Sequence, residues 1–322
     1  MFDVVCVGHA LIDITVSVPD SFLSGANLKK GSMSLVDDVS QKFVLSSIQG
    51  MNSSMSSGGS ASNVALGVSC LGGKSCFIGK VGGDVNGSFF ESTLESRGVV
   101  PKLSKDALLM TGSAVAFITP DGERTFSTYL SAASSLKKGD VLDVPRAKFF
   151  HVEAYLLELS DVRDLIMDLV FKAKKQGTKI SFDLSDASLI NRIKPIISDF
   201  LEHVDVVFAN EDEAKAFTGE DSFGAARILS NVCEVAVVKL GERGSVVVSG
   251  SVQEVIEPEI VKPINTNGAG DAYAAGFLFA RSRGLDLASS AEVASFIAKE
   301  TVLVEGASVE RSLKDECESL LD

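Results

Sequence analysis

The chain has 322 residues, long enough to bury a large core, and its 30 Lys and Arg against 43 Asp and Glu give a net charge of −13. This charge repels polyanions and no run of Lys and Arg offsets it, so we expect no binding to nucleic acid or to a membrane. The five cysteines form no Cys-x-x-Cys pair, and no basic segment precedes the apolar N-terminal stretch. We therefore expect reduced thiols, no zinc cluster and a soluble cytoplasmic protein.

The chain begins with a predicted strand, Asp3 to Val7, whose continuous apolar residues suit the interior of a parallel sheet. Asp13 follows where this strand leaves the sheet, and open α/β sheets bind ligands at the carboxyl ends of their strands. A solvated turn is the alternative place for this aspartate. The segments 14–18 and 32–36 look like short strands that fit neither the core sheet nor a crossover helix. They predict a separate small sheet.

Gly58-Gly59-Ser60 opens a predicted helix that carries Asn63, so glycines and a hydroxyl stand at a helix N-terminus, where polar or anionic ligands bind. A P-loop ending at Gly73-Lys74-Ser75 would need glycine at position 68, which is Val68. No Gly-x-Gly-x-x-Gly follows the first strand either. The P-loop reading therefore fails, and a dinucleotide oxidoreductase is disfavoured.

The segments 113–119 and 124–130 alternate in polarity around Pro120-Asp121-Gly122-Glu123, which is typical of a β-hairpin turn. A hairpin is out of place in a run of strand–helix–strand units. Together with the earlier short strands it predicts a β lid over the edge of the main sheet. We expect one domain, 1–322, with lid strands at 13–37 and a lid hairpin at 109–132 as insertions.

Apolar strand patterns alternate with helical patterns in the second half of the chain, with strands expected at 149–152, 180–184, 204–208 and 235–238 and a helix between 160 and 177. This order predicts a doubly wound, mostly parallel sheet with helices on both faces. Asn210 and Glu213 follow one of these strands. They suit the start of a helix that is capped by Asn210 and has acids in its first turn.

Small polar residues and glycines pass directly into a helical pattern at Asn265 to Phe279. Gly268-Ala269-Gly270, here called the anion cradle, should form the first turn of a helix that ends near Gly284. Its free N–H groups and partial positive charge suit a phosphate or a developing oxyanion. Asp271 lies in the same turn, so a base and an anion site share one place. Alternatively, Asp271 only complements the helix dipole.

The motif Asn-Thr-Asn-Gly-Ala-Gly-Asp and the Gly-Gly-x-x-x-Asn of 58–63 resemble the paired signatures of the ribokinase or PfkB family of ATP-dependent carbohydrate and nucleoside kinases. The resemblance spans nearly the whole chain. It implies a ribokinase-like α/β fold with a small β-sheet lid, transfer of the ATP γ-phosphate to a hydroxyl, Mg²⁺, and a monovalent cation such as K⁺ near the anion cradle. Asn265 stands where the family usually has Asp, and His9 where it usually has Asn.

The resemblance also implies residue roles. Asp271 is expected as the base, Gly268, Ala269 and Gly270 as stabilisers of the transferring group, and Arg124 as a lid residue near the phosphate; a solvated strand arginine is the alternative. The residues expected to bind the acceptor are Asp13, His9, Gly58, Gly59 and Asn63. Those expected at the nucleotide are Asn210, Glu213, Lys239, Gly241 and Gly244, with Mg²⁺ held by Glu213 through water. His9 has a second interpretation as a packed, internally satisfied histidine.

The segments Gly8 to Asp13 and Glu153 to Leu157 resemble the adenosine-kinase-like branch, so we predict phosphorylation of the 5′-hydroxyl of adenosine or a related nucleoside. Tyr129 and Tyr155 are the candidates for an aromatic wall against the base. A sugar kinase for ribose or fructose is the alternative. A nucleotide-binding regulator without turnover is disfavoured because binding alone needs no carboxylate beside the cradle. The sequence leaves monomer and homodimer open.

Overall fold

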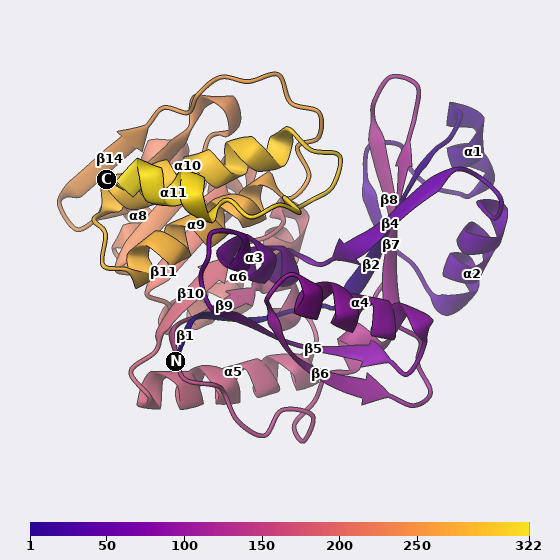
Figure 1. Ribbon diagram of the computed structural model, residues 1–322, viewed down its shortest axis with the longest axis horizontal. Coiled ribbons are helices and arrows are strands. Elements are labelled where there is room, and N and C mark those ends of the chain that lie inside the picture. The colour runs from indigo at the N-terminus through magenta and orange to yellow at the C-terminus, as the bar shows by residue number, and fades with distance from the viewer. Residues whose placement is uncertain (322) are drawn as a thin grey trace.

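A computed structural model describes residues 1–321 of the chain, which form two sheets (Figure 1). The large sheet has nine strands, and in spatial order these are β14 (Val252–Ile256), β13 (Ser245–Ser249), β12 (Val235–Lys239), β11 (Val206–Asn210), β10 (Lys179–Asp183), β9 (Ala147–Glu153), β1 (Phe2–Val7), β5 (Ser75–Gly82) and β6 (Val100–Asp106). All pairs from β6 to β12 are parallel, whereas β13 and β14 add antiparallel at one edge. The predicted doubly wound sheet is confirmed.

Helices cover both faces of the large sheet, because its strands are apolar on both sides. One face carries α5 (Ser160–Lys175), α6 (Ala187–Leu201), α7 (Glu211–Thr218) and α8 (Ser222–Ser230). The other face carries α3 (Ser60–Cys70), α4 (Val85–Ser96), α9 (Ala269–Ser282), α10 (Leu287–Val302) and α11 (Lys314–Leu321). Every residue from Ala272 to Ala280 is buried, so α9 is the central helix of its layer.

The small sheet has five strands in the order β3 (Met33–Leu35), β8 (Arg124–Tyr129), β7 (Gly112–Ile118), β2 (Leu11–Ser17) and β4 (Ser53–Gly58). The helices α1 (Asp20–Gly25) and α2 (Asp38–Ser47) pack on it through Val16, Phe117 and Val44. Four of these strands lie at segments that were predicted as strands: β7 and β8 in the alternating hairpin, and β2 and β3 in the two short strand-like stretches. The fifth, β4, lies in the Ser-rich stretch, where mostly exposed Ser and Met residues give no strand pattern.

The two faces of the small sheet differ in chemistry. Side chains alternate along a strand, and the register of β2, β7 and β8 therefore places Asp13, Phe126 and Arg124 on one face. Tyr129 lies on the opposite face, where Gln41 of α2 hydrogen-bonds the neighbouring strands. Only the first face carries the predicted acceptor and phosphate residues.

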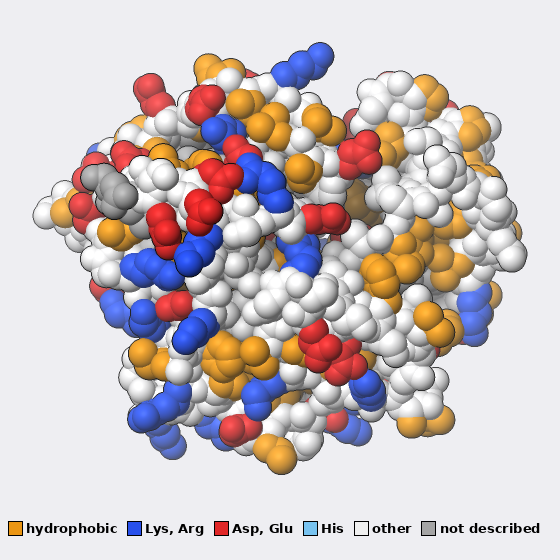
Figure 2. All heavy atoms as spheres, in the orientation of Figure 1, with side chains coloured by type: hydrophobic (Ala, Val, Ile, Leu, Met, Phe, Trp, Pro, Cys, Tyr) orange, Lys and Arg blue, Asp and Glu red, His pale blue; other side chains and the backbone are white. Residues whose placement is uncertain are grey.

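The space-filling view shows a notch between the part that carries the small sheet and the larger part of the molecule (Figure 2). Short 3₁₀ helices, η1 (Ser131–Ser135), η2 (Ala154–Leu157) and η3 (Gly241–Arg243), follow β8, β9 and β12. Within residues 1–321, no helix is long and apolar enough to cross a bilayer.

Candidate active site

Asp271 lies in the first turn of α9, and its carboxylate is held by two side chains from the start of α3. Ser60 Oγ donates to Oδ1 over 2.8 Å, and Asn63 Nδ2 donates to Oδ2 over 2.9 Å. The Oδ1 atom of Asn63 is buried and has no partner among the described residues, so it can accept a hydrogen bond from a bound molecule. The two predicted motifs therefore meet in one site.

Gly268 precedes α9 with a left-handed φ of +76°, and a Cβ there would lie 2.0 Å from the carbonyl oxygen of Ala307. Only glycine fits this position. The N–H of Ala269 is 3.4 Å from Thr266 O, a weak contact. The cradle thus offers helix N-terminal donors beside the Asp271 carboxylate.

Burial raises the pKa of Asp271 to about 6; the hydrogen bond from Asn63 opposes this shift, and the negative charge of Asp183 adds to it. A group with this pKa is mostly ionised at neutral pH yet is more basic than an ordinary aspartate. It has the protonation behaviour required of a general base.

Asp13 approaches the start of α3 at Gly58, where a Cβ would lie 2.0 Å from Asp13 Oδ1. Glycine at 58 is therefore required for this approach. Burial, and then the charge of Asp271, raises the pKa of Asp13 to about 7. The two carboxylates thus share one poorly solvated space, in which both can accept hydrogen bonds from hydroxyl groups.

Lys239 forms a partly buried ion pair with Asp183, with Nζ 2.8 Å from Oδ2. The strands β10 and β12 end on either side of β11, which brings these side chains together. A Cβ at Gly270 would lie 3.1 Å from Lys239 Nζ, so the ammonium group lies against the cradle. Burial lowers the pKa of Lys239, but Asp183 and Glu213 outweigh this effect and raise it overall. Asp183 was not among the predicted site residues.

Asn210 and Glu213 form a capping box at the start of α7. Glu213 Oε2 accepts the Asn210 N–H over 2.8 Å, and Oε1 accepts from Asn210 Nδ2 over 2.7 Å. Burial and then Asp183 raise the pKa of Glu213 to about 7. The helix-cap interpretation is therefore correct. Among the described residues no three His, Cys, Asp or Glu side chains are grouped so that they could hold a metal ion directly.

Gly241 and Gly244 lie in the turn after β12, and both have left-handed φ values, +62° and +88°. The turn begins two residues after Lys239, at the same end of the sheet as Asn210.

A buried acid that the sequence analysis did not select, Glu153 at the end of β9, joins two predicted acceptor segments. Its Oε1 accepts the His9 N–H over 3.0 Å, and its Oε2 accepts the Ala61 N–H over 2.9 Å. Burial lowers the pKa of His9 to about 4, so its ring is neutral at pH 7, with Nδ1 3.5 Å from Glu153 Oε1. The contacts of His9 are to other protein groups, which matches the interpretation of His9 as a packed, internally satisfied histidine.

Arg124 reaches from β8 to the loop before α9, where its guanidinium donates to Asn265 Oδ1. The residues lie 141 positions apart, so this bond connects the small sheet to the large part of the molecule. Arg124 is thus near the cradle through Asn265.

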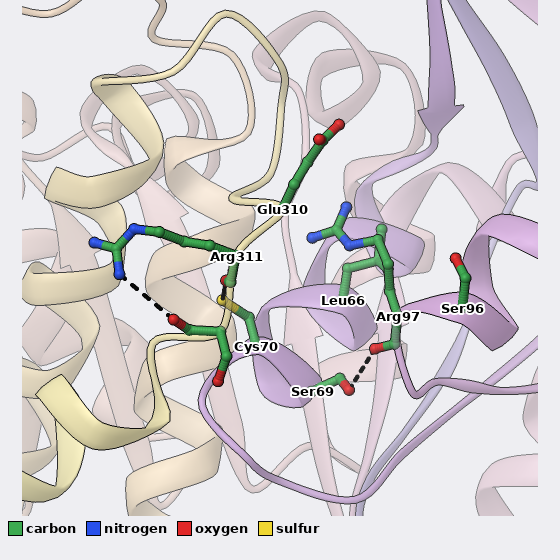
Figure 3. A pocket seen from close by; sticks show the side chains of 8 residues that line it. Leu66, Ser69, Cys70, Ser96, Arg97, Glu310 and Arg311 are labelled. Carbon is green, nitrogen blue, oxygen red and sulfur yellow. Dashed lines mark hydrogen bonds between the residues drawn. The ribbon is translucent and has the colours of Figure 1, made fainter.

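A cavity of about 220 Å³ lies away from these residues, between α3, the end of α4 and the loop 310–312 (Figure 3). Its lining residues are Leu66, Ser69, Cys70, Ser96, Arg97, Glu310, Arg311 and Ser312. Arg97 lies partly buried in this wall and donates to Ser308 Oγ over 2.8 Å and to the carbonyl of Val309. The cavity contains none of the predicted site residues.

The half-buried carboxylate of Asp271 lies beside a helix N-terminal anion site and a lysine, at the carboxyl edge of a doubly wound sheet. This arrangement suits the transfer of a phosphoryl group to a hydroxyl. The family model described as "pfkB family carbohydrate kinase" matches residues 1–313. The chain belongs to the pfkB family of carbohydrate kinases, and ATP is the phosphoryl donor that this family uses.

Relatives with different names resemble the chain to similar degrees. A fructokinase of Vibrio alginolyticus is 31% identical over 249 residues, covering 74% of this chain and 81% of its own. An adenosine kinase of Dictyostelium discoideum is 28% identical over 333 residues, which cover 96% of this chain and 97% of the relative. Among solved structures, adenosine kinase from Sinorhizobium meliloti matches with a TM-score of 0.90, 33% identity and 99% of both chains covered. A probable sugar kinase from Rhizobium etli matches with a TM-score of 0.90, 31% identity and 99% and 98% covered. The chain is a nucleoside or sugar kinase.

Proposed function

We propose that this enzyme phosphorylates the 5′-hydroxyl of adenosine or a closely related nucleoside. The observation that carries the chemistry is the position of Asp271, held by Ser60 and Asn63 in the first turn of α9. In this proposal the acceptor lies between Asp13 and Asp271, and ATP lies along the end of β12 beside Lys239, Gly241 and Gly244.

Asp271 takes the proton of the acceptor hydroxyl as its oxygen attacks the γ-phosphorus of ATP. A new P–O bond forms, the bond to the β–γ bridging oxygen breaks, and ADP leaves with that electron pair. The N–H groups of Gly268, Ala269 and Gly270, together with Lys239, stabilise the charge on the transferring group. Arg124 adds a further cation from the small sheet, which acts as the lid.

Mg²⁺ fits the oxygen donors at the start of α7. Glu213 would hold it through water, because both carboxylate oxygens already accept hydrogen bonds from Asn210. When bound, the ion would neutralise charge on the phosphates.

Among the relatives aligned by sequence, coverage supports a nucleoside acceptor, because the adenosine kinase of Dictyostelium aligns with 96% of this chain and the fructokinase of Vibrio with 74%. The solved structures support both candidates equally, since the adenosine kinase and the probable sugar kinase each cover 99% of this chain. A nucleoside acceptor needs an apolar wall against which its nucleobase can stack. Tyr129 lies on the face of the small sheet opposite Asp13, and Tyr155 donates to Ser185 O and packs on the core. We therefore assign the wall to Phe126, which is half-buried on the Asp13 face.

A sugar acceptor remains the second candidate, since the fructokinase of Vibrio is 31% identical to this chain. Asp13 and Asn63 could bind the hydroxyls of a free sugar equally well, because their contacts are to hydroxyls in either case. The two candidate acceptors differ in whether a nucleobase adds to their binding affinity.

The experiment is an acceptor panel with Mg-ATP, in which adenosine, inosine, ribose and fructose are compared by kcat/KM. The proposal expects adenosine to give the highest value and the product to be AMP. Efficient turnover of fructose or ribose with none of adenosine would refute the nucleoside assignment while leaving the kinase family intact.

A further inference from the structure

The side chain of Asn265 is fully engaged by protein groups on all sides. Its Nδ2 donates to the carbonyl of Glu305 and lies 3.4 Å from that of Gly306. Its Oδ1 accepts from Arg124 and, over 2.7 Å, from the N–H of Asn267. The residue is only 9% exposed. A primary amide has two donors and one acceptor oxygen, so this site uses every polar group that the side chain offers.

The main-chain oxygens of Glu305 and Gly306 converge on this amide nitrogen. Carbonyl oxygens that converge with a carboxylate are the ligands of a hard cation. An amide N–H₂ has no lone pair for a metal, and here it already presents its positive hydrogens to the carbonyls. The residues present at 265, 305 and 306 therefore do not fit the monovalent cation that the family resemblance implies near this loop.

The loop that the amide holds lies against the anion cradle. Ala307 O would be 2.0 Å from a Cβ at Gly268, and the N–H groups of Ile264 and Asn265 donate to Val302 O. Fixing Glu305 and Gly306 therefore also fixes the wall behind the first turn of α9. A cation on the same two carbonyls could also fix this wall, but only while the cation is bound.

We infer that the Asn265 side-chain amide takes the place of a monovalent cation, so that the enzyme holds its anion cradle and turns over without K⁺. The part of this inference that concerns turnover rests on the proposed kinase reaction. The part that concerns binding does not, because it follows from which atoms face the two carbonyls.

The test compares the protein in about 100 mM KCl with the protein in choline chloride at equal ionic strength, so that screening is constant. Two readouts are taken: the thermal midpoint without substrates, and kcat with Mg-ATP and the best acceptor. For the natural sequence we expect the kcat values in KCl and in choline chloride to differ by less than about twofold. We also expect no saturable shift of the thermal midpoint with K⁺. A bound cation would raise the midpoint with K⁺ concentration.

Asn265→Asp is the informative variant. One carboxylate oxygen keeps the contacts with Arg124 and the Asn267 N–H, and the other replaces the amide nitrogen against the carbonyls of Glu305 and Gly306. That second oxygen repels the two carbonyls until a cation or a proton lies between them. We expect this variant to gain a saturable rise in thermal midpoint with K⁺ and at least about a tenfold rise in kcat, whereas choline has no effect.

Arg97→Gln is the matched control. Arg97 lies in the wall of the cavity (Figure 3) and donates to Ser308 and Val309 of the same loop, so its loss loosens the loop without adding a carboxylate. We expect no K⁺ response from it. A saturable K⁺ response of the natural protein in either readout overturns the inference, even if Asn265→Asp fails to fold. If no acceptor is phosphorylated, the midpoint alone decides, and that failure belongs to the proposed function.

Discussion

The side-chain amide of Asn63 donates a hydrogen bond to the carboxylate of Asp271 over 2.9 Å, although 208 residues separate the two. This bond joins the start of α3 to the start of α9 and so unites the two halves of the site. It also tunes the proposed base, because hydrogen bonding to the ionised form lowers the pKa of Asp271 against the effect of burial.

Removing this bond should move the acid limb of the pH profile. In Asn63→Ala the carboxylate loses a donor, so the pKa of Asp271 rises and kcat begins to fall at a higher pH than in the natural protein. The measurement is kcat against pH between about 5 and 9 at saturating acceptor. An unchanged acid limb, with only KM altered, would show that Asn63 binds acceptor without tuning Asp271.

Asp13→Ala should weaken binding of the acceptor and leave the binding of ATP unchanged. Loss of a charged acceptor of hydrogen bonds in a closed site costs about 2 to 4 kcal/mol, or roughly 30- to 700-fold in acceptor binding. Calorimetry measures both ligands separately. Equal weakening of acceptor and ATP would instead mean that Asp13 supports the fold around Gly58.

Much of the site could be predicted because its residues follow recognisable local patterns. The cradle, Asp271 and Asn63 all stand at helix N-termini marked by glycines, and Asn210 stands at the end of an apolar strand. These signals are local in sequence, so no knowledge of the strand order was needed. The role of Lys239 was implied by the family resemblance alone.

The contributions of Asp183 and Glu153 depend on the strand order, and for that reason the sequence does not reveal them. Asp183 pairs with Lys239 only because β10 and β12 flank β11, and Glu153 bridges His9 and Ala61 only because β9 lies beside β1. Each is a buried acid at the end of a predicted strand, and that combination is the signal that could have selected them.

The aromatic wall could not be placed from sequence for a different reason. Both faces of the small sheet are half covered, so the alternation along β8 does not reveal which face is turned to Asp13. Only the register with β7 and β2 separates Phe126 from Tyr129.

Phe126→Ala should discriminate between acceptors. Loss of a stacking partner costs about 1 to 3 kcal/mol per base, so KM for adenosine should rise roughly 5- to 150-fold while that for a free sugar stays nearly constant. Tyr129→Ala is the matched control on the opposite face and should leave both values close to those of the natural protein. A larger effect from Tyr129 would contradict the assignment.

The stability of the ligand-free protein should fall as the pH rises from 6.5 to 8. Burial raises the pKa values of Asp13, Glu153 and Glu213 to about 7, so the folded state binds protons that the unfolded state has already lost. Stability from these groups is present at low pH and is lost as the pH rises through about 7, on the order of 1 kcal/mol for each group. Below 6.5 the buried His9 and His151, whose pKa values burial lowers to about 4, act in the opposite direction.

Urea unfolding at a series of pH values measures this trend. Glu213→Gln removes one of the three titrations and should flatten the slope between pH 6.5 and 8. A free energy of unfolding that increases between pH 6.5 and 8 would contradict this prediction. It would mean that the folded protein favours the ionised form of these carboxyls.

If Asp271 removes the proton from the acceptor hydroxyl, the single-turnover rate of Asp271→Asn must fall sharply. With enzyme in excess over Mg-ATP and saturating acceptor, we expect phosphoryl transfer slower by about 100- to 10,000-fold, with ATP affinity and thermal midpoint nearly unchanged. A single-turnover rate within a few-fold of the natural protein's would show that another group takes the proton.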